Sequence, residues 1–405
     1  MKFLPLNEQM DLIKRGAHEI IPEDELVKKI EISIKEGKPL KIKLGCDPSR
    51  PDLHLGHSVV LRKLGQFQQL GHQAILIIGD FTGMIGDPSG RNVTRPSLSL
   101  EETRKNGASY LEQASKILNK EKTKIVYNSE WLSKMSFEDV IKLSSKYTVA
   151  RMIERDDFTK RFKAGEPISL HEFLYPLAQA MDSVAISSDV ELGGTDQKFN
   201  LLVGRDIQRE FGMEPQVILT MPLIVGTDGI EKMSKSYNNY IGISDSPQEI
   251  FGKTLSIPDS LIYNYYELAT DISNEELFDL RKQLNDQQVN PRDLKRKLAK
   301  TIVKMYHSEN AAVEAEAEFD KIFIRKEIPD EIPEITLDKG ETEIGILELL
   351  VKVNFASSKG EARRLVVQGG VTIDGNKVDD ISANIALDKE LILKVGKRKF
   401  IKLKK

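Results

Sequence analysis

Two short apolar runs enclose one amphipathic stretch near the start of the chain, and this pattern constrains the fold most. The runs "KIKLG" and "QAILIIGD" are typical of strands at 41–45 and 73–80. The stretch 54–70 between them has helical periodicity and is followed by Gly71, a common helix C-terminal residue. The second run is apolar on both faces, as a buried parallel strand requires. The pattern therefore predicts a βαβ unit and an α/β fold with a parallel sheet.

The rest of the chain predicts further domains, because 405 residues exceed one ordinary core. The stretch 290–319 has helical periodicity, Asn290 as N-cap and no strand pattern. Residues 344–405 hold 13 basic and 7 acidic side chains, a net +6, so the preceding 343 residues carry −9 of the total −3. The terminal run "LILKVGKRKFIKLKK" has strand-like apolar residues on both sides of Gly396 and predicts a hairpin. We expect an α/β domain, a helical domain and a small basic α+β domain.

Composition excludes several classes of protein. No apolar run approaches the roughly 20 residues that cross a bilayer, and "MKFLPLNEQM" lacks the apolar core of a signal peptide. We therefore expect an intracellular protein without a membrane partner. Cys46 is the only cysteine, so an intrachain disulfide and a cysteine-based zinc site are excluded.

Three polar clusters follow predicted strands, where the N-termini of helices are expected to offer unpaired N–H groups to anions. In "GCDPSRPDLHLGH", His54 and His57 are three residues apart, on one face of a helix, with Gly56 leaving the backbone accessible. The other clusters are "GDFTGMIGDPSGRN" and "ELGGTDQ", the second with Thr195 as the N-cap of a helix that continues to Gly212. Taken singly, the first cluster also fits two exposed surface histidines. The other two clusters also fit turn and helix-cap residues.

The loop "GIEKMSKSYN" places Lys232 and Lys235 on a short polar segment after an apolar run. Ammonium groups on a mobile loop can close over a polyphosphate and neutralise charge that grows during phosphoryl or nucleotidyl transfer. Alone, the loop also fits a solvated charged turn. The order of histidine pair, "GGTDQ", lysine loop and helical domain favours a shared nucleotide site.

These motifs together resemble the class I aminoacyl-tRNA synthetases, specifically the bacterial tyrosyl-tRNA synthetase family in its branch with an intact "KMSKS". "HLGH" and "KMSKS" match the signatures of the class, and "TGMIGDPSGR", "YPLAQAMD" and "GGTDQKFN" match the tyrosine-specific segments. The segment "FASSKGEARRLVVQGGVTIDGNKV" resembles the S-four-type RNA-binding domain of bacterial members. The likeness covers nearly the whole chain.

The resemblance implies an activity and a set of site residues. L-Tyrosine and Mg²⁺-bound ATP would give tyrosyl-adenylate, and the tyrosyl group would pass to the 3′-terminal ribose of tRNA(Tyr), with no protein-bound metal or organic cofactor. The catalytic residues would be Ser49, His54, His57, Arg91, Arg95, Lys232 and Lys235. ATP would be bound by Asp47, Gly56, His57, Gly194, Asp196, Lys235 and Ser236. Tyrosine would be bound by Thr82, Asp87, Tyr175, Gln179, Asp182 and Gln197, and tRNA by Lys359, Arg363, Arg364 and Lys377.

Spacing agrees with one part of this assignment, since Tyr175, Gln179 and Asp182 fall on one helix face. Read alone, the same residues fit a core aromatic and a solvated acid. An aspartate that accepts from a phenol would reject phenylalanine, because the acceptor would be left buried and unpaired.

The resemblance also implies a domain plan. A Rossmann-like catalytic domain would occupy 1–225, with an insertion at about 120–170 in a homodimer interface. The KMSKS loop and connection (226–246), an α-helical anticodon-binding domain (247–326), a linker (327–342) and the S-four-type domain (343–405) would follow. A cytoplasmic location is expected.

One departure from the family pattern leaves a question open. Lys43 and Leu44 stand where common members have tyrosine and cysteine, so the usual partner of the phenol is missing or replaced. Lys43 could reach the phenol region or pair with a carboxylate. The alternatives for the whole chain are a tryptophan-specific relative, a small-molecule nucleotidyltransferase and a non-catalytic RNA-binding paralogue, and the intact lysines and histidines argue against the last.

Overall fold

The computed structural model describes residues 3–48, 52–87, 99–325, 332–336, 342–396 and 399–404. The chain forms two compact units, Met1–Ala312 and Val313–Lys405. Within the described ranges, no helix is both long and apolar enough to cross a membrane.

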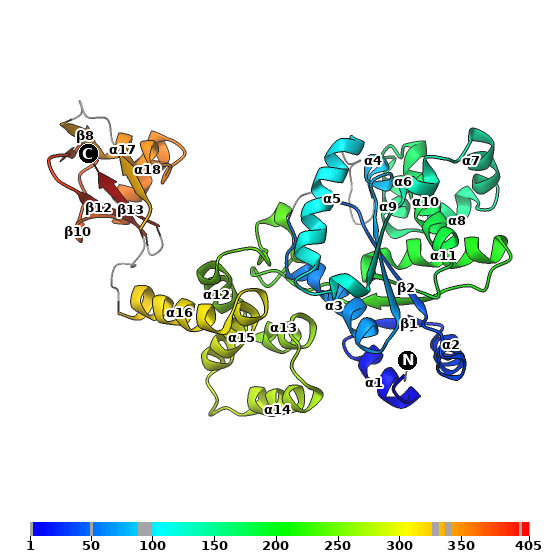
Figure 1. The fold of residues 1–405 in the computed structure, drawn as a ribbon. Coiled ribbons are helices and arrows are strands. Elements are labelled where there is room, and N and C mark those ends of the chain that lie inside the picture. Colours follow the sequence, from blue (N-terminus) through cyan, green and yellow to red (C-terminus); the bar gives the residue numbers. More distant parts are fainter. Residues whose placement is uncertain are drawn as a thin grey trace. The chain divides into compact units, whose positions relative to one another are not determined.

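A six-stranded sheet of order β1-β6-β5-β2-β3-β4 forms the centre of the first unit (Figure 1). Its strands are β1 (Glu19–Ile21), β2 (Lys41–Cys46), β3 (Gln73–Ile78), β4 (Thr123–Tyr127), β5 (Val190–Gly194) and β6 (Val217–Met221). All neighbours are parallel except β1 and β6. The predicted βαβ unit is confirmed as β2, α3 (Leu55–Gln69) and β3.

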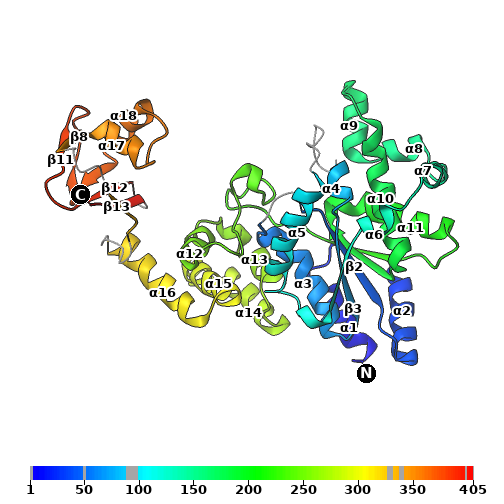
Figure 2. The same cartoon turned by 45° about the horizontal axis from the view of Figure 1, so that its top comes forward.

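The direction of winding reverses between β2 and β5. From β2 the chain proceeds outward to β3 and β4, and it then returns to β5 and proceeds to β6 on the other side. Right-handed crossovers consequently place α3 and α5 (Leu100–Ala114) on one face and α10 (Leu170–Ile186) and α11 (Lys198–Glu210) on the other, as Figures 1 and 2 show. A crevice opens at such a switch point, outside the carboxyl ends of the strands.

Further helices complete the α/β part and the helical part of this unit. The former are α1 (Leu6–Lys14), α2 (Glu23–Glu36), α4 (Thr82–Ile85), α6 (Ser129–Leu132), α7 (Phe137–Ser144), α8 (Val149–Ile153) and α9 (Asp156–Ala164). The helices of the helical part are α12 (Pro247–Leu255), α13 (Ile262–Ala269), α14 (Asn274–Asn285), α15 (Pro291–Tyr306) and α16 (Glu309–Phe319). The division between the two units falls within α16.

Two local predictions need correction. Thr195 does not cap a long helix, because Thr195–Gln197 form a separate 3₁₀ turn and α11 begins only at Lys198. The helical stretch 290–319 is interrupted at His307, whose φ of −127° and ψ of −97° end α15 before α16 starts. Asn290 does cap α15, since its side chain accepts from the Arg292 N–H.

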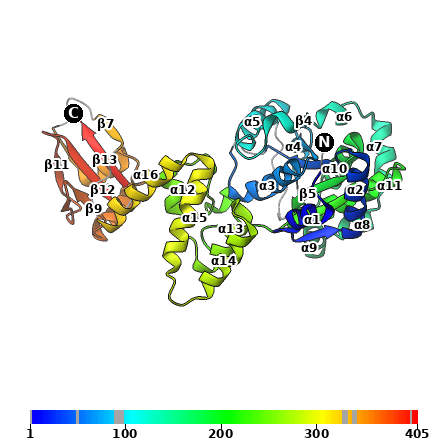
Figure 3. The ribbon, with the colours of Figure 1, turned by 60° about the horizontal axis from the view of Figure 1, so that its bottom comes forward.

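The second unit is a small α+β domain. It contains β7 (Glu334–Thr336), β8 (Glu343–Gly345), α17 (Ile346–Lys352), α18 (Lys359–Val367), β9 (Val371–Ile373), β10 (Asn376–Lys377), β11 (Asn384–Ala386), β12 (Leu391–Val395) and β13 (Lys399–Lys404). The predicted C-terminal hairpin is confirmed: β12 and β13 are antiparallel with Leu393 opposite Ile401 (Figure 3). Most of the predicted linker 327–342 lies outside the described residues.

Candidate active site

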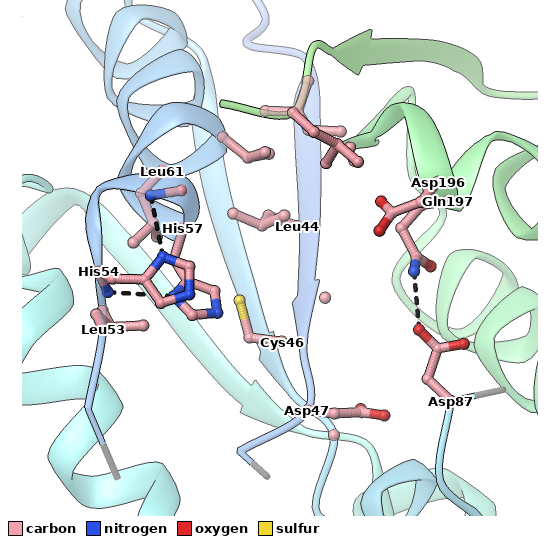
Figure 4. A pocket seen from close by; sticks show the side chains of 18 of the residues that line it. Leu44, Cys46, Asp47, Leu53, His54, His57, Leu61, Asp87, Asp196 and Gln197 are labelled. Carbon is pink, nitrogen blue, oxygen red and sulfur yellow. Dashed lines mark hydrogen bonds between the residues drawn. The ribbon is translucent and has the colours of Figure 1, made fainter. Parts of the chain in front are cut away.

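A cavity of about 660 Å³ lies at the switch point, at the carboxyl ends of β2 and β5 (Figure 4). All of the predicted catalytic and small-molecule residues that the structure describes line it: Asp47, His54, Gly56, His57, Thr82, Asp87, Tyr175, Gln179, Asp182, Gly194, Asp196, Gln197, Lys232, Lys235 and Ser236. Ser49, Arg91 and Arg95 lie outside the described residues. Segments up to about 190 residues apart in the sequence thus meet around one space.

The histidine pair forms the N-terminus of α3. His54 is the N-cap and His57 the third helical residue, and their ring centroids are 3.9 Å apart. The Nδ1 of His54 accepts from the Gly56 N–H at 3.1 Å, and the Nδ1 of His57 accepts from the His54 N–H at 3.2 Å. Because each Nδ1 is an acceptor, each Nε2 carries the proton and is free to act as a donor.

Both imidazoles are neutral at physiological pH. Burial, followed by electrostatic interactions with His57 and Lys235, lowers the pKa of His54 to about 2. Burial and the Lys235 charge lower the pKa of His57 to about 4. The pair therefore offers two neutral N–H donors.

The expected unpaired N–H groups at the start of α3 are not found, so that prediction is wrong. The N–H of Leu55 donates to the Ile241 carbonyl at 3.0 Å, that of Gly56 to His54, and that of His57 to the His54 carbonyl at 2.9 Å. Ile241, the acceptor of the Leu55 N–H, lies in the strand-like segment after the lysine loop. An anion at this helix end would consequently meet side chains before backbone N–H groups.

The lysine loop is folded beside the histidines. The ammonium of Lys235 donates to the Asp52 carbonyl at 2.8 Å and lies 3.2 Å from its carboxylate, and that of Lys232 lies 3.0 Å from the Asp196 carboxylate. Asn239 shapes the loop: it accepts from the Ser234 N–H at 2.8 Å and donates to Asp228 at 2.8 Å. Both lysines are therefore held at the cavity by carboxylates.

A second group of polar side chains lies at the ends of β2 and β3. Asp47 accepts from the Tyr175 hydroxyl at 2.8 Å and from the Thr82 hydroxyl at 2.7 Å. A Cβ at Gly79 would lie 1.9 Å from the Asp47 carboxylate, so only glycine fits there. Gln197 donates to Asp87 at 2.8 Å across the cavity (Figure 4).

Asp182 is buried at the inner end of the cavity. It accepts from the Trp131 indole at 2.9 Å and from the Asn128 amide at 3.4 Å. Burial raises the pKa of Asp182 to about 7, against the lowering effects of the Lys43 charge and of these two hydrogen bonds. Its carboxyl group therefore changes protonation close to physiological pH.

Several residues that organise the site carry no sequence motif. The sequence analysis does not predict Asp52, Asn128 and Trp131, whose partners are distant in the sequence, or Asn239, which acts on the lysine loop just before it. Lys43 pairs with a carboxylate, the second of the two alternatives: its ammonium is 2.8 Å from Glu191. Burial, with the Asp47 charge, raises the pKa of Cys46 to about 12, so this cavity-lining thiol is not ionised at neutral pH.

The predicted RNA-binding residues belong to the second unit. Lys359, Arg363 and Arg364 are exposed on α18, and Lys377 is exposed on β10. They therefore present positive charge to solvent.

Comparison with known proteins agrees with this geometry. A family model described as tRNA synthetases class I (W and Y) matches residues 35–324, and one described as the Tyrosine–tRNA ligase SYY-like C-terminal domain matches residues 324–403. The chain belongs to the class I tRNA synthetases of this tryptophan and tyrosine group.

Individual relatives narrow the assignment. The Tyrosine–tRNA ligase of Carboxydothermus hydrogenoformans is 56% identical to this chain over 403 residues, which cover 98% of each chain. The Tyrosine–tRNA ligase of Thermotoga maritima is 56% identical over 396 residues, which cover 98% of this chain and 97% of the relative. A crystal structure of tyrosyl-tRNA synthetase from Archaeoglobus fulgidus complexed with L-tyrosine has a TM-score of 0.64 at 25% identity and covers 77% of this chain and 99% of its own. The activity is accordingly that of a tyrosine–tRNA ligase, an aminoacyl-tRNA synthetase that uses ATP as substrate.

The protonation of Asp182 is directly measurable. Removing the indole donor in Trp131→Phe should raise the carboxyl pKa of Asp182 further, by about one unit, because a hydrogen bond to the charged form is lost. A carboxyl ¹³C NMR titration of the ligand-free protein measures this shift. Asp139, whose pKa is held below its ordinary value by hydrogen bonds from Ser136, is the internal reference. An Asp182 midpoint near 4 in the unaltered protein would contradict the assignment.

Proposed function

We propose that this cavity carries out both steps of tyrosine–tRNA ligation. The carboxylate of L-tyrosine attacks the α-phosphorus of ATP in line, the bond to the β-phosphate oxygen breaks, and pyrophosphate departs from tyrosyl-adenylate. A hydroxyl of the 3′-terminal ribose of tRNA(Tyr) then takes the tyrosyl group. The observation that carries the proposal is that both histidines and both lysines line the same cavity as Gln179 and Asp182.

The amino acid is assigned to the inner end of the cavity. The Oε1 of Gln179 is buried and has no hydrogen-bond partner among the described residues, which supports a role as acceptor for the ammonium of tyrosine. Asp87 and Tyr175 complete this ammonium site. Asp182 would accept from the phenol, and Thr82 and Gln197 hold Asp47 and Asp87 in place.

ATP is assigned to the outer part. Asp196 and Gly194 would hold the ribose, with Asp47, Gly56 and Ser236 beside the nucleotide. His54 and His57 would donate from Nε2 to the triphosphate. Lys232 and Lys235 would exchange Asp196 and Asp52 for phosphate oxygens, which concentrates positive charge where it is needed as pyrophosphate leaves. Ser49, Arg91 and Arg95 are proposed to join them, and Mg²⁺ would enter as part of the ATP substrate.

The first step is tested by amino-acid-dependent exchange of pyrophosphate into ATP. We expect exchange with L-tyrosine and background rates with the other nineteen amino acids. Lys235→Ala should lower the pre-steady-state rate of adenylate formation by about 10²- to 10³-fold, because a charge contact made in the transition state is lost, while tyrosine affinity changes little. Lys253→Ala is the control, since Lys253 is ion-paired with Asp245 and does not line the cavity. An unchanged rate in Lys235→Ala would defeat the assignment.

The basic face of α18 is proposed to bind the phosphate backbone of tRNA. Replacing Arg363 and Arg364 by alanine should weaken tRNA binding and reduce the slope of log affinity against log salt by about one for each arginine. Fluorescence titrations of the full chain at several salt concentrations measure this slope. Lys389→Ala removes another exposed cation of the same unit, paired with Asp374, and serves as the control. An unchanged slope in the double variant would refute the RNA role of this face.

We also propose that the enzyme is a homodimer in the cytoplasm, with the insertion at about 120–170 in the interface. This segment exposes Phe137, Ile141, Val149, Phe162 and Leu170, each at least 55% accessible. Large apolar side chains gathered in one segment favour burial by a partner. Leu170→Asp should shift the protein from dimer to monomer in sedimentation equilibrium, and Phe278→Asp, at an exposed apolar residue of α14, should not. A monomer in the unaltered protein would rule out the dimer.

A further inference from the structure

Lys43 is a fully buried cation. It lies on β2 directly opposite Glu191 of β5, and their side chains are 0% and 1% exposed. The ammonium contacts the Glu191 Oε1 at 2.8 Å, the Gln179 carbonyl at 3.0 Å and the Ser183 hydroxyl at 2.7 Å. The pair therefore joins two central strands to α10.

Glu191 is equally well satisfied. Its Oε1 also accepts from the Gln179 amide at 3.2 Å, and its Oε2 accepts from the Ser183 hydroxyl at 3.1 Å and from the Gln216 amide. Burying two charges is costly, and well-packed apolar residues often stabilise a protein as much as a buried ion pair does. Stability alone is thus a weak reason for this pair.

The pair determines which way the Gln179 amide faces. Because its Nε2 donates to Glu191, its Oε1 is the atom left for the cavity, where it is buried without a partner among the described residues. A flipped amide would place an N–H donor there and repel an ammonium group. The acceptor oxygen of Glu191 therefore favours the observed orientation of the Gln179 amide.

We propose that Lys43 and Glu191 are positioning residues of the amino-acid subsite: Glu191 orients the Gln179 oxygen toward the ammonium of tyrosine, and Lys43 holds Glu191 in place through its ion pair and contributes a positive charge near Asp182. The inference rests on the function proposed above and deepens it. Neither residue touches the reacting atoms, and both act through Gln179 and Asp182.

The surroundings of Asp182 show why the charge of Lys43 matters. Burial raises the pKa of Asp182 most, and Lys43 on β2, Trp131 on α6 and Asn128 beside it lower this pKa. Glu191 on β5 raises it. Without Lys43, the pKa of Asp182 would rise further, and the Glu191 carboxylate would lose its ion-pair partner. The acceptor proposed for the phenol would then become a poorer one.

The test is steady-state pyrophosphate exchange with Lys43→Met. We expect the KM for tyrosine to rise about tenfold or more, as for loss of one charged hydrogen bond, while the KM for ATP changes less than about twofold. The preference for tyrosine over phenylalanine in kcat/KM should fall, and the pH midpoint of kcat/KM for tyrosine should move upward.

Lys63→Met is the matched control: Lys63 is also buried, but its ammonium bonds only to the carbonyls of Leu12, Ile13 and Arg15 among the described residues. It should lose thermal stability and keep the tyrosine KM.

A second variant separates positioning from folding. Lys43→Met/Glu191→Leu replaces both charges by apolar side chains, and we expect it to recover thermal stability without recovering the tyrosine KM or the discrimination against phenylalanine. If this folded double variant shows an unaltered tyrosine KM and discrimination, the proposal is overturned. Absence of tyrosine-dependent exchange in the unaltered enzyme would instead overturn the proposed function.

Discussion

Two backbone hydrogen bonds hold the site together. The N–H of Leu55 donates to the Ile241 carbonyl at 3.0 Å, and the N–H of Ile243 donates to the Leu53 carbonyl at 3.1 Å. They join the chain just before α3 to the chain just after the lysine loop, so that the histidine pair and Lys235 lie around one space. The sheet provides that space, because the reversal of winding between β2 and β5 leaves a crevice that neither crossover covers.

The electrostatic design follows from this arrangement. The imidazoles are kept neutral by burial and by the Lys235 charge, while the two lysines rest on Asp52 and Asp196. Under the proposed function, each lysine exchanges its carboxylate partner for a phosphate oxygen. Around Gln179 and Asp182 the cation is buried instead: Lys43 is ion-paired with Glu191, and its charge lowers the pKa of Asp182. Under the proposed function, the lysines bind phosphate, and Asp87 and Asp182 bind the amino acid, in one cavity.

Much of this could be predicted from sequence where local pattern decides the outcome. Apolar runs and a helical period between them gave the βαβ unit, and helical spacing placed Tyr175, Gln179 and Asp182 on one face. The terminal hairpin followed from strand-like residues around Gly396. The roles of the site residues and the domain boundaries remain predictions.

The rest depends on contacts between distant segments. Lys43 meets Glu191 only because β2 and β5 pair in one particular register, and Trp131 reaches Asp182 only once α6 packs against α10. The misplaced helix start at Thr195 has a local cause: one 3₁₀ turn fits between the end of β5 and α11, and cap preferences cannot distinguish it from a helical first turn. The N–H of Leu55 at the start of α3 is paired because its acceptor, Ile241, comes from a segment nearly two hundred residues away, which local pattern cannot predict.

The central claim is that the histidine pair and the lysine loop act on the same triphosphate. A double-mutant cycle with His57→Ala and Lys235→Ala, measured on the single-turnover rate of tyrosyl-adenylate formation, tests it most directly. Residues that stabilise one developing charge should be coupled, so the combined loss should differ from the product of the single losses by about fivefold or more. If the combined loss equals the product of the two single losses to within about twofold, the two motifs act independently, and this result would contradict the account.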